Sequence, residues 1–464
     1  MAERLRATDG RMMDSGHVLT DVTVTDLLGR FTHRVGFPAD DEFVIVHGPN
    51  GVGKTMLLDL ISAIVWPVDI AKIMNVPFRT LRLAFSDDSV LTIDRASTDF
   101  DRNRYDLDQE DHRGVTIRLT FVLTGPHRRR VHWSSVLQRH DDRSLTRDSE
   151  TLLFSALSER AHVPLDRRLE QMLRNLNAHT GSDSLTDKAT RDVPPDLREF
   201  LAGIAVHSID THRLLGLSAP DAGRSLSKAA SLTKVEQFAQ DLARRLGDAL
   251  VTNSRTSQEL DRTYPQRLLA SSAAGNISEQ EIRSRYDAQN ELRRRLGDIS
   301  LVDEDSSVIV IPKRMEPWQR AVLWTYLSDT EHKLATFKGI LDRVSLLQSI
   351  INSRFLFKRL EIDRERGFRL LSDEDQELDL TSLSSGEQHE LVLVYDLLFN
   401  VPTGALVLID EPEISLHVSW QKGFIGDLRK IASLVRFRSV VATHSPQIAG
   451  RWADRMVVLG PTAE

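Results

Sequence analysis

The sequence contains no cysteine. Disulfide bonds, thiolate zinc sites and cysteine nucleophiles are therefore excluded, and the chain suits a reducing compartment. Long apolar runs are missing too, because the longest stretches, 405–410 and 439–442, fall far short of the ~20 residues that cross a bilayer. The first sixteen residues lack the apolar segment of a secretory signal. We therefore expect a cytoplasmic protein with no membrane partner.

Positive charge is not in excess. Lys and Arg number 60 against 67 Asp and Glu, which gives a formal net charge of −7. Bulk charge of this sign does not indicate a nucleic-acid-binding protein. A basic cluster at 127–130 leaves a local contact with DNA phosphate open, although a solvated hairpin turn is the commoner reason for such a cluster.

A glycine-rich loop follows an apolar run near residue 48. Residues 42–65 are typical of a strand, a loop and a helix in that order. The loop fits the pattern G-x-x-x-x-G-K-[ST] with Gly48, Pro49, Asn50, Gly51, Val52, Gly53, Lys54 and Thr55. Its backbone N–H groups and the helix N-terminus would bind phosphate oxygens. Lys54 would reach the β- and γ-phosphates of a nucleotide, and Thr55 would ligate Mg²⁺.

Three further motifs follow late in the chain. An apolar strand at 405–409 ends in Asp410 and Glu411, which suit a Mg²⁺ shell and the polarisation of an attacking water. The loop residues Ser384, Ser385, Gly386 and Glu387 precede a helix, and could bind an anion or simply cap that helix. A third strand ends at His444, which could contact a γ-phosphate.

The order GPNGVGKT, LSSGEQ, LVLIDEPE, ATHSP resembles the head domain of ABC ATPases, and more closely the SMC, RecF and OLD-like branch of AAA-family ATPases. Some members of that branch serve in antiphage systems such as PARIS or Septu. The resemblance covers roughly 18–135 and 356–460. It implies an ATPase with ATP and Mg²⁺ as cofactors, in which Asp410 is the Walker B aspartate, Glu411 the catalytic glutamate and His444 the switch histidine.

The resemblance also implies that Ser384 to Glu387 form the signature, which acts on ATP held by a second copy of the chain. The expected state is a head-to-tail pair that closes on ATP and opens after hydrolysis, gating a separate nuclease effector or acting in DNA maintenance. The D-loop would be 414–417, where His417 replaces the aspartate usual in transporters. The Q-loop glutamine has no clear position, with Gln109 and His212 as candidates.

The expected fold is α/β: an ABC-type P-loop NTPase head, with a mixed sheet flanked by helices, interrupted by a large α-helical insertion. We expect an N-terminal half over 1–150, a helical subdomain over 151–355 and a C-terminal half over 356–464. Apolar stripes in the middle range indicate core packing, as do Trp318 and Trp324. Pro265 suggests a break in this helical region.

Other functions remain possible from the sequence. A DNA clamp of the RecF or SMC kind is the principal alternative, although no heptad array indicates a long coiled coil. An ABC transporter ATPase subunit is disfavoured by the long middle segment and by DEPEISLH after the carboxylate strand. A P-loop small-molecule kinase would leave the signature and His444 unexplained.

Overall fold

The protein is described by a computed structural model that covers residues 17–37, 43–97, 115–126, 128–139, 192–210, 233–270, 278–302, 311–312, 314–414, 416 and 418–460. Internal contacts divide these residues into two units. The first draws on 1–208, 402–411 and 437–464, and the second on 209–401 and 412–436. Each unit is described by itself. No helix among the described residues is long and apolar enough to span a membrane.

The first unit carries a five-stranded sheet in the order β14-β3-β13-β12-β8. Its strands are β3 (Phe43–His47), β8 (Val206–Asp210), β12 (Leu406–Asp410), β13 (Arg438–Thr443) and β14 (Met456–Val458). The strands β14, β3, β13 and β12 pair in parallel. Nearly every residue of β3, β12 and β13 is buried, as expected for strands covered on both faces. Strand β8 lies at the edge of this sheet, beside β12.

The described residues of this unit also form a six-stranded antiparallel sheet in the order β2-β1-β4-β5-β6-β7. Its members are β1 (Leu19–Leu27), β2 (Phe31–Gly36), β4 (Thr80–Phe85), β5 (Val90–Ser97), β6 (Val115–Gly125) and β7 (Arg128–Arg139). Buried and accessible residues alternate along β2 and β4, so one face of these strands packs on the core. The predicted hairpin is confirmed where Gly125 pairs with Arg128.

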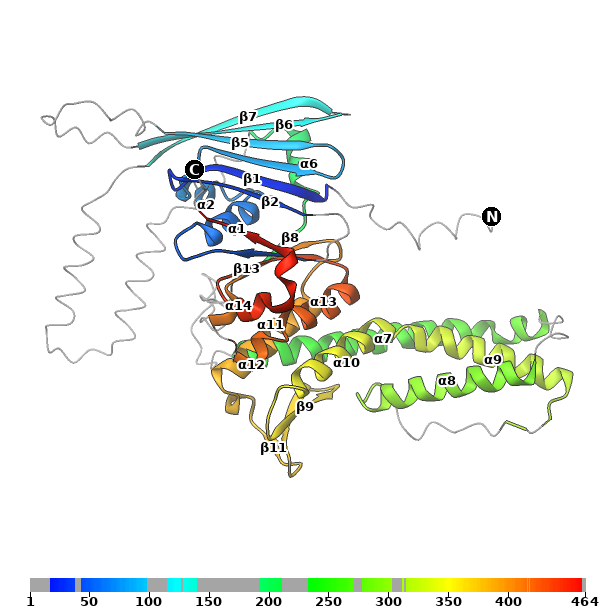
Figure 1. Ribbon diagram of the computed structural model, residues 1–464. Coiled ribbons are helices and arrows are strands. Elements are labelled where there is room, and N and C mark those ends of the chain that lie inside the picture. The colour runs from blue at the N-terminus through cyan, green and yellow to red at the C-terminus, as the bar shows by residue number, and fades with distance from the viewer. Residues whose placement is uncertain are drawn as a thin grey trace, which may run out of the picture. The chain divides into compact units, whose positions relative to one another are not determined.

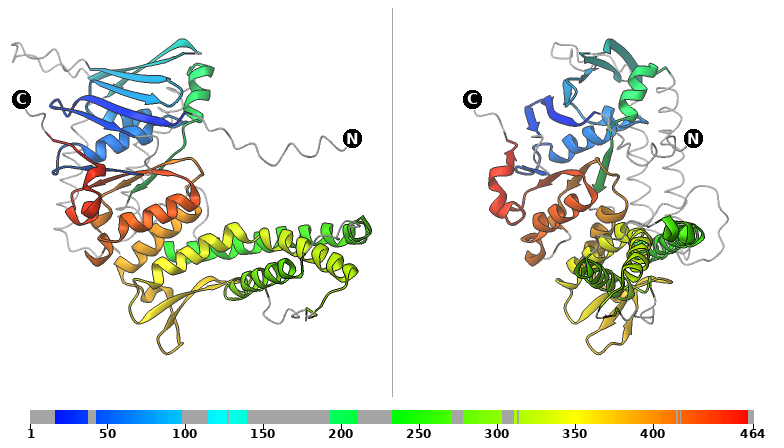
Figure 2. Two further views of the ribbon diagram at one scale, coloured as in Figure 1. Left: turned by 45° about the vertical axis from the view of Figure 1, so that its right-hand side comes forward. Right: turned by 90° about the vertical axis from the view of Figure 1, so that its right-hand side faces the viewer.

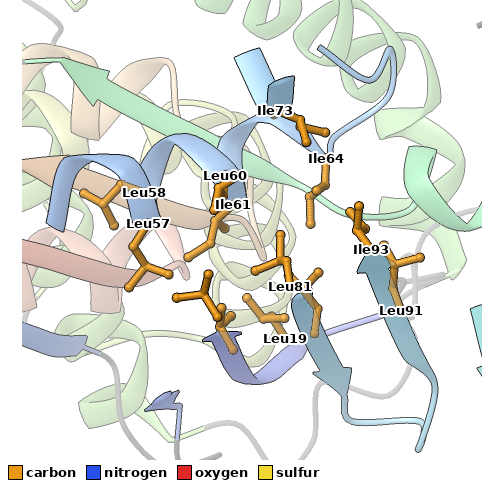
Figure 3. Packing of buried hydrophobic residues seen from close by; sticks show 14 of the residues in the cluster. Leu19, Leu57, Leu58, Leu60, Ile61, Ile64, Ile73, Leu81, Leu91 and Ile93 are labelled. Carbon is orange, nitrogen blue, oxygen red and sulfur yellow. The ribbon is translucent and has the colours of Figure 1, made fainter. Parts of the chain in front are cut away.

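Helix α1 (Lys54–Ala63) shares one hydrophobic core with both sheets. Leu57, Leu60 and Ile61 of this helix are fully buried, together with Leu81 from β4 and Leu408 from β12. Figure 3 shows α1 residues beside those of the antiparallel strands. Helices α2 (Ile70–Asn75), α6 (Pro195–Ala202) and α14 (Pro446–Ala449) and the 3-10 helix η5 (Gly450–Arg455) complete the unit. The start of α1 is therefore held firmly relative to the parallel sheet.

The second unit is mainly helical (Figures 1 and 2). Its helices are α7 (Lys234–Ala270), α8 (Glu279–Gly297), α9 (Pro317–Ala335), α10 (Lys338–Asn352), α11 (Ser385–Phe399), α12 (Val418–Gln421) and α13 (Phe424–Val435). A small antiparallel sheet, ordered β11-β10-β9, joins them with β9 (Lys358–Asp363), β10 (Gly367–Ser372) and β11 (Glu377–Leu378). Short 3-10 turns lie at η3 (Leu380–Ser382) and η4 (Pro412–Ile414). The right view of Figure 2 looks nearly along the long helices.

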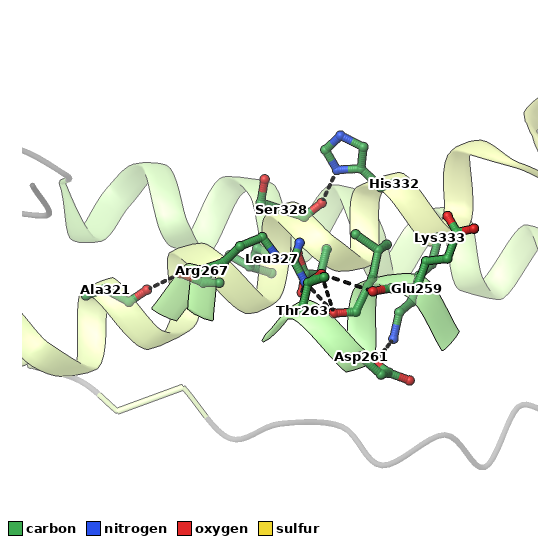
Figure 4. A network of polar contacts seen from close by, with 12 residues as sticks. Glu259, Asp261, Thr263, Arg267, Ala321, Leu327, Ser328, His332 and Lys333 are labelled. Atoms are coloured by element: carbon green, nitrogen blue, oxygen red, sulfur yellow. Dashed lines mark hydrogen bonds and ion pairs between the residues drawn. The ribbon is translucent and has the colours of Figure 1, made fainter. Parts of the chain in front are cut away.

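The predicted break at Pro265 is wrong, because α7 runs through it. Proline removes one backbone donor from a helix, and side chains here bond to carbonyls of the preceding turn. Arg267 Nη2 donates to Leu260 O at 2.5 Å, and Thr263 Oγ1 donates to Glu259 O at 3.0 Å. Arg267 also pairs with Asp329 on α9 (Figure 4 shows this region). Arg267 thus connects the turn that contains Pro265 both to the carbonyl of Leu260 and to α9.

One other expectation for this region needs correction. Trp318, expected in the core, is 66% exposed at the start of α9, whereas Trp324 packs against a small hydrophobic cluster. Helices α12 and α13 are separate, and Gly423 caps the start of α13. The apolar stripe that begins at Val235 is confirmed as core, because its members are buried.

The contact-based units do not follow the three ranges expected from the sequence. The signature segment 384–387 lies in the second unit, whereas the carboxylate strand β12 and the histidine strand β13 lie in the first. Chain ranges alone do not reveal this division, because the chain passes between the units several times. The boundaries near 150 and 355 stay a prediction.

Candidate nucleotide-binding site

The phosphate loop connects β3 to α1. Gly51 and Gly53 adopt φ angles of 85° and 92°, which a residue with a side chain rarely tolerates. A Cβ on Gly53 would lie 2.5 Å from Leu27 Cδ2, and one on Gly48 would lie 2.5 Å from Leu459 O. Backbone conformation therefore favours glycine at Gly51 and Gly53, and close packing favours it at Gly48 and Gly53.

Lys54 is held within the curve of this loop. Its side chain is buried, and Nζ donates to Gly48 O at 2.8 Å and to Pro49 O at 3.2 Å. The neighbouring Thr55 is exposed, as are Pro49, Asn50 and Gly51 at the tip of the loop. The ammonium is therefore positioned beneath an accessible loop, where an anion could recruit it.

His33 on β2 contacts the backbone of the phosphate loop, and sequence reasoning missed this contact. Its ring is buried, and Nε2 lies 2.8 Å from Val52 O. A carbonyl oxygen only accepts, so Nε2 carries the hydrogen of this bond. The ring also stacks on Phe31 at 5.6 Å between centroids. Nothing in the sequence near His33 indicates this contact, because nineteen positions separate the two residues.

Asp410 lies at the carboxyl end of β12 and contacts the phosphate loop. Thr55 Oγ1 donates to Asp410 Oδ2 at 2.7 Å, across 355 positions of sequence. Burial and the neighbouring carboxylates Glu411 and Asp59 raise the pKa of Asp410, and they outweigh the bond from Thr55 and the charge of Lys54. Three carboxyl groups, those of Asp59, Asp410 and Glu411, therefore lie close enough to influence one another where the sequence predicts a cation.

Glu411 follows directly and has an unusual backbone. Its φ is 42°, and its N–H donates to Ala442 O on β13 at 2.8 Å. A non-glycine residue in this region carries strain, which is commonest where a side chain must be aimed at a functional site. The turn directs the chain away from the sheet directly after Asp410.

His444 follows the end of β13 and lies beside Glu411. The distance from His444 Nδ1 to Glu411 Oε1 is 3.8 Å, too long for a hydrogen bond and short enough for charge interaction. The His444 side chain is 45% exposed and that of Glu411 is 21% exposed. Ser445 N donates to Thr443 Oγ1 at 2.9 Å, which fixes the turn that presents the histidine.

Strand register explains why these groups meet. Asp410 pairs with Ala442, and Thr443 pairs with His47, the last residue before the loop. Three parallel strands therefore end at one edge of the sheet, and their following residues converge there. The first unit brings together Lys54, Thr55, Asp410, Glu411 and His444, as the sequence predicts.

The signature residues begin α11 in the second unit. Ser384 caps the helix, its N–H and Oγ both donate to Glu387 Oε2 at 2.8 Å, and Lys358 Nζ donates to the same oxygen at 2.9 Å. Burial acts to raise the pKa of Glu387, and the bonds from Lys358 and Ser384 outweigh it, so the pKa is lowered. The capping interpretation of this motif is confirmed. Ser384 and Ser385 remain exposed, so the loop can still meet a ligand.

The remaining predicted positions cannot be placed. Gln109, His212 and His417 lie outside the described residues. Sequence reasoning also missed Arg354, from the segment before β9, and Lys358, the first residue of β9, both of which contact the signature helix.

The residues present fit a nucleotide and Mg²⁺. The loop is built on glycines at positions where a Cβ would meet Leu459 O (from Gly48) or Leu27 Cδ2 (from Gly53), so its tight curve, of the kind that binds phosphate, depends on residues without side chains. Among the described residues no group of three or more carboxylates, histidines or cysteines could hold a metal alone. Mg²⁺ commonly takes one or two protein ligands and completes its shell with phosphates and water. Thr55 and Asp410 would be those ligands.

Substitution of Gly53 tests the geometry of the loop. We expect Gly53→Ala to abolish detectable nucleotide binding and to destabilise the protein by about 1–3 kcal/mol, because the new Cβ meets Leu27 at a strained φ. Gly51→Ala is the matched control, since Gly51 has a similar φ but no atom within 4 Å of a Cβ. Thermal melting and titration with a fluorescent ATP analogue measure both effects. Equal losses in the two variants would contradict the packing argument.

Fold and site together define an α/β protein with a phosphate loop of the P-loop type. A family model described as "AAA domain, putative AbiEii toxin, Type IV TA system" matches residues 216–449, just over half of the chain. The chain belongs to this AAA-domain family. The narrower resemblance to PARIS or Septu components stays a prediction.

Individual relatives are distant. "Retron Ec83 probable ATPase" from Escherichia coli is 32% identical over 103 residues, which span 20% of this chain and 19% of the relative. Among solved structures, "SMC head domain from Thermotoga maritima" matches with a TM-score of 0.28 and 10% identity, over 93% of this chain and 91% of that one. "Crystal structure of the SmcHead bound to the C-winged helix domain of ScpA" matches with a TM-score of 0.32 and 10% identity, over 95% and 93%. TM-scores of this size do not establish a shared fold, so the fold assignment stands on strand order and motifs.

Proposed function

We propose that this protein is an ATP-hydrolysing switch that closes as a head-to-tail pair of two copies. The observation that carries the proposal is the convergence of a phosphate loop, a Thr55–Asp410 contact, Glu411 and His444 at one edge of a parallel sheet. Membership of an AAA-domain family supports the ATPase activity.

Each residue of the site has a separate role in binding or hydrolysing ATP. Loop N–H groups and Lys54 bind the phosphates, and Thr55 and Asp410 hold the cation. Mg²⁺, when bound, neutralises charge that develops on the transferred phosphoryl group. Glu411 orients the attacking water and accepts its proton, and His444 contacts the γ-phosphate from the next strand. Glu411 has a strained backbone and a carboxylate that lies 3.8 Å from His444, as befits a side chain held in place for a function.

The signature completes the site on the opposite copy. Ser384 and Ser385 are exposed at the N-terminus of α11, where hydroxyl and N–H groups favour an anion. ATP would hold two copies together by contacts to both, and hydrolysis would remove the γ-phosphate contacts and release them. We further propose that this cycle gates a partner effector, such as a nuclease, in antiphage defence. The toxin–antitoxin description of the family and the retron name of one relative support that setting.

A mixing experiment tests the head-to-tail arrangement. Lys54→Ala inactivates the phosphate loop, and Ser385→Arg inactivates the signature at an exposed position where folding should be unaffected. Each variant alone should lack ATPase activity. Mixed, they should regain it, because every mixed pair contains one site with an intact loop and an intact signature. A mixture that stays inactive would contradict composite sites. Hydrolysis that required DNA would instead favour the clamp function.

A further inference from the structure

The segment between α10 and β9 exposes two large apolar residues side by side. Phe355 is buried, whereas Leu356 is 71% exposed and Phe357 is 80% exposed. Phe357 also has a φ of 63°, in the left-handed region that favours glycine or asparagine. Single exposed apolar residues are ordinary on a protein surface. An adjacent pair, with its phenylalanine held in a disfavoured conformation, needs a reason.

Charged residues on both sides of Leu356 and Phe357 form ion pairs that attach this segment to the signature helix. Arg354, whose side chain is only 7% exposed, pairs with Glu390 of α11 and with Asp427 of α13. Lys358 bonds to Glu387 of α11 at 2.9 Å. Glu387 and Glu390 are three positions apart, so they lie on the same face of the first turns of the helix. The exposed pair is thereby bracketed by contacts to the helix that carries the signature.

Hydrogen bonds between α10 and β9 restrain the segment further. Asn352 Oδ1 accepts from Leu360 N at 2.7 Å, and Asn352 Nδ2 donates to Leu360 O at 3.0 Å. Phe355 N donates to Ile351 O at 3.0 Å, which continues the end of α10. The short connection is therefore restrained by hydrogen bonds between α10 and β9 as well as by its ion pairs to α11. An exposed apolar pair on a restrained connection loses little conformational entropy when it is buried by a partner.

We propose that Leu356 and Phe357 pack against the second copy of the chain when two heads close on ATP. The proposal rests on the proposed function, since it identifies part of the interface that the signature requires. The second copy is the expected occupant because Lys358 joins the pair directly to Glu387, so a head that meets the signature loop also meets this segment. Aromatic residues are enriched among the buried anchors of protein interfaces.

The test uses the full chain carrying Glu411→Gln, so that ATP remains bound. Leu356→Ser with Phe357→Ser should raise the dissociation constant of the Mg-ATP-dependent pair about tenfold or more, as loss of interface anchors does. Binding of ATP to single heads should not change. Val251→Ser with Leu269→Ser is the matched control, because these exposed residues lie on α7 of the same unit. Sedimentation at graded protein concentrations measures the constants.

A second variant separates the interface from folding. Phe357→Gly removes the side chain, and glycine suits the φ of 63°. The variant should therefore keep or raise the melting temperature while weakening association of the two copies of the chain. An unchanged dissociation constant in both variants would overturn the inference and leave the proposed function intact. The same result is expected if Leu356 and Phe357 bind an effector instead of the second copy. If two copies of the Glu411→Gln parent did not associate in the presence of Mg-ATP, both the inference and the proposed function would be overturned.

Discussion

Lys54→Ala is expected to weaken ATP binding by roughly 100-fold or more, the loss that removal of charge-assisted bonds to phosphate produces. The side chain is buried in the curve of the loop, where Nζ is held by Gly48 O and Pro49 O at 2.8 and 3.2 Å. Its ammonium is therefore already placed to meet the phosphates. Isothermal titration with ATP in the presence of Mg²⁺ measures the loss.

The matched control is Lys72→Ala. Lys72 lies on α2 of the same unit and pairs with Asp59 at 2.7 Å, away from the loop carbonyls. We expect this variant to bind ATP as the parent does. Wild-type affinity in Lys54→Ala would show that the loop does not bind phosphate, and the assignment of the site would fail.

Glu411→Gln is expected to bind ATP normally and to hydrolyse it about 10²–10⁴-fold more slowly, the contribution typical of a positioned general base. The amide keeps the size of the side chain but cannot accept the proton of water. Single-turnover hydrolysis with saturating enzyme measures the chemical step without interference from binding. Glu199→Gln, on the exposed face of α6, is the control and should hydrolyse ATP at the parental rate.

A Glu411→Gln variant with parental turnover would contradict the assignment of the base. Asp410→Asn separates the two adjacent carboxylates, because Asp410 bonds to Thr55 and is expected to act through the cation. That variant should therefore respond to the concentration of Mg²⁺, whereas Glu411→Gln should not. The same Mg²⁺ response in both variants would mean that the two roles are not distinct.

Local motifs made the first unit largely predictable. The spacing from Gly48 to Thr55 specifies a loop conformation directly, and apolar runs that end in Asp410 and His444 indicate buried parallel strands. Because parallel strands end at one edge, the sequence also predicts that their last residues meet, which the register of β3, β13 and β12 bears out. The roles assigned to these residues stay predictions.

Contacts between distant segments were not predictable in the same way. His33 reaches the loop from β2. Arg354, before β9, and Lys358, at its start, reach α11, and no local pattern indicates any of these contacts. Pro265 suggested a break because proline disfavours helices, yet tertiary contacts of Arg267 sustain α7. Trp318 was expected in the core on hydrophobicity alone, which does not determine which side of a helix faces solvent.

Head pairing is tested most directly by the solution mass of Glu411→Gln, measured with and without Mg-ATP. We predict the mass of one chain without nucleotide and the mass of two chains with it, because ATP would bridge a phosphate loop and the signature of the opposite copy. A mass of one chain under both conditions, at ATP concentrations that saturate the loop, would contradict the two-headed switch.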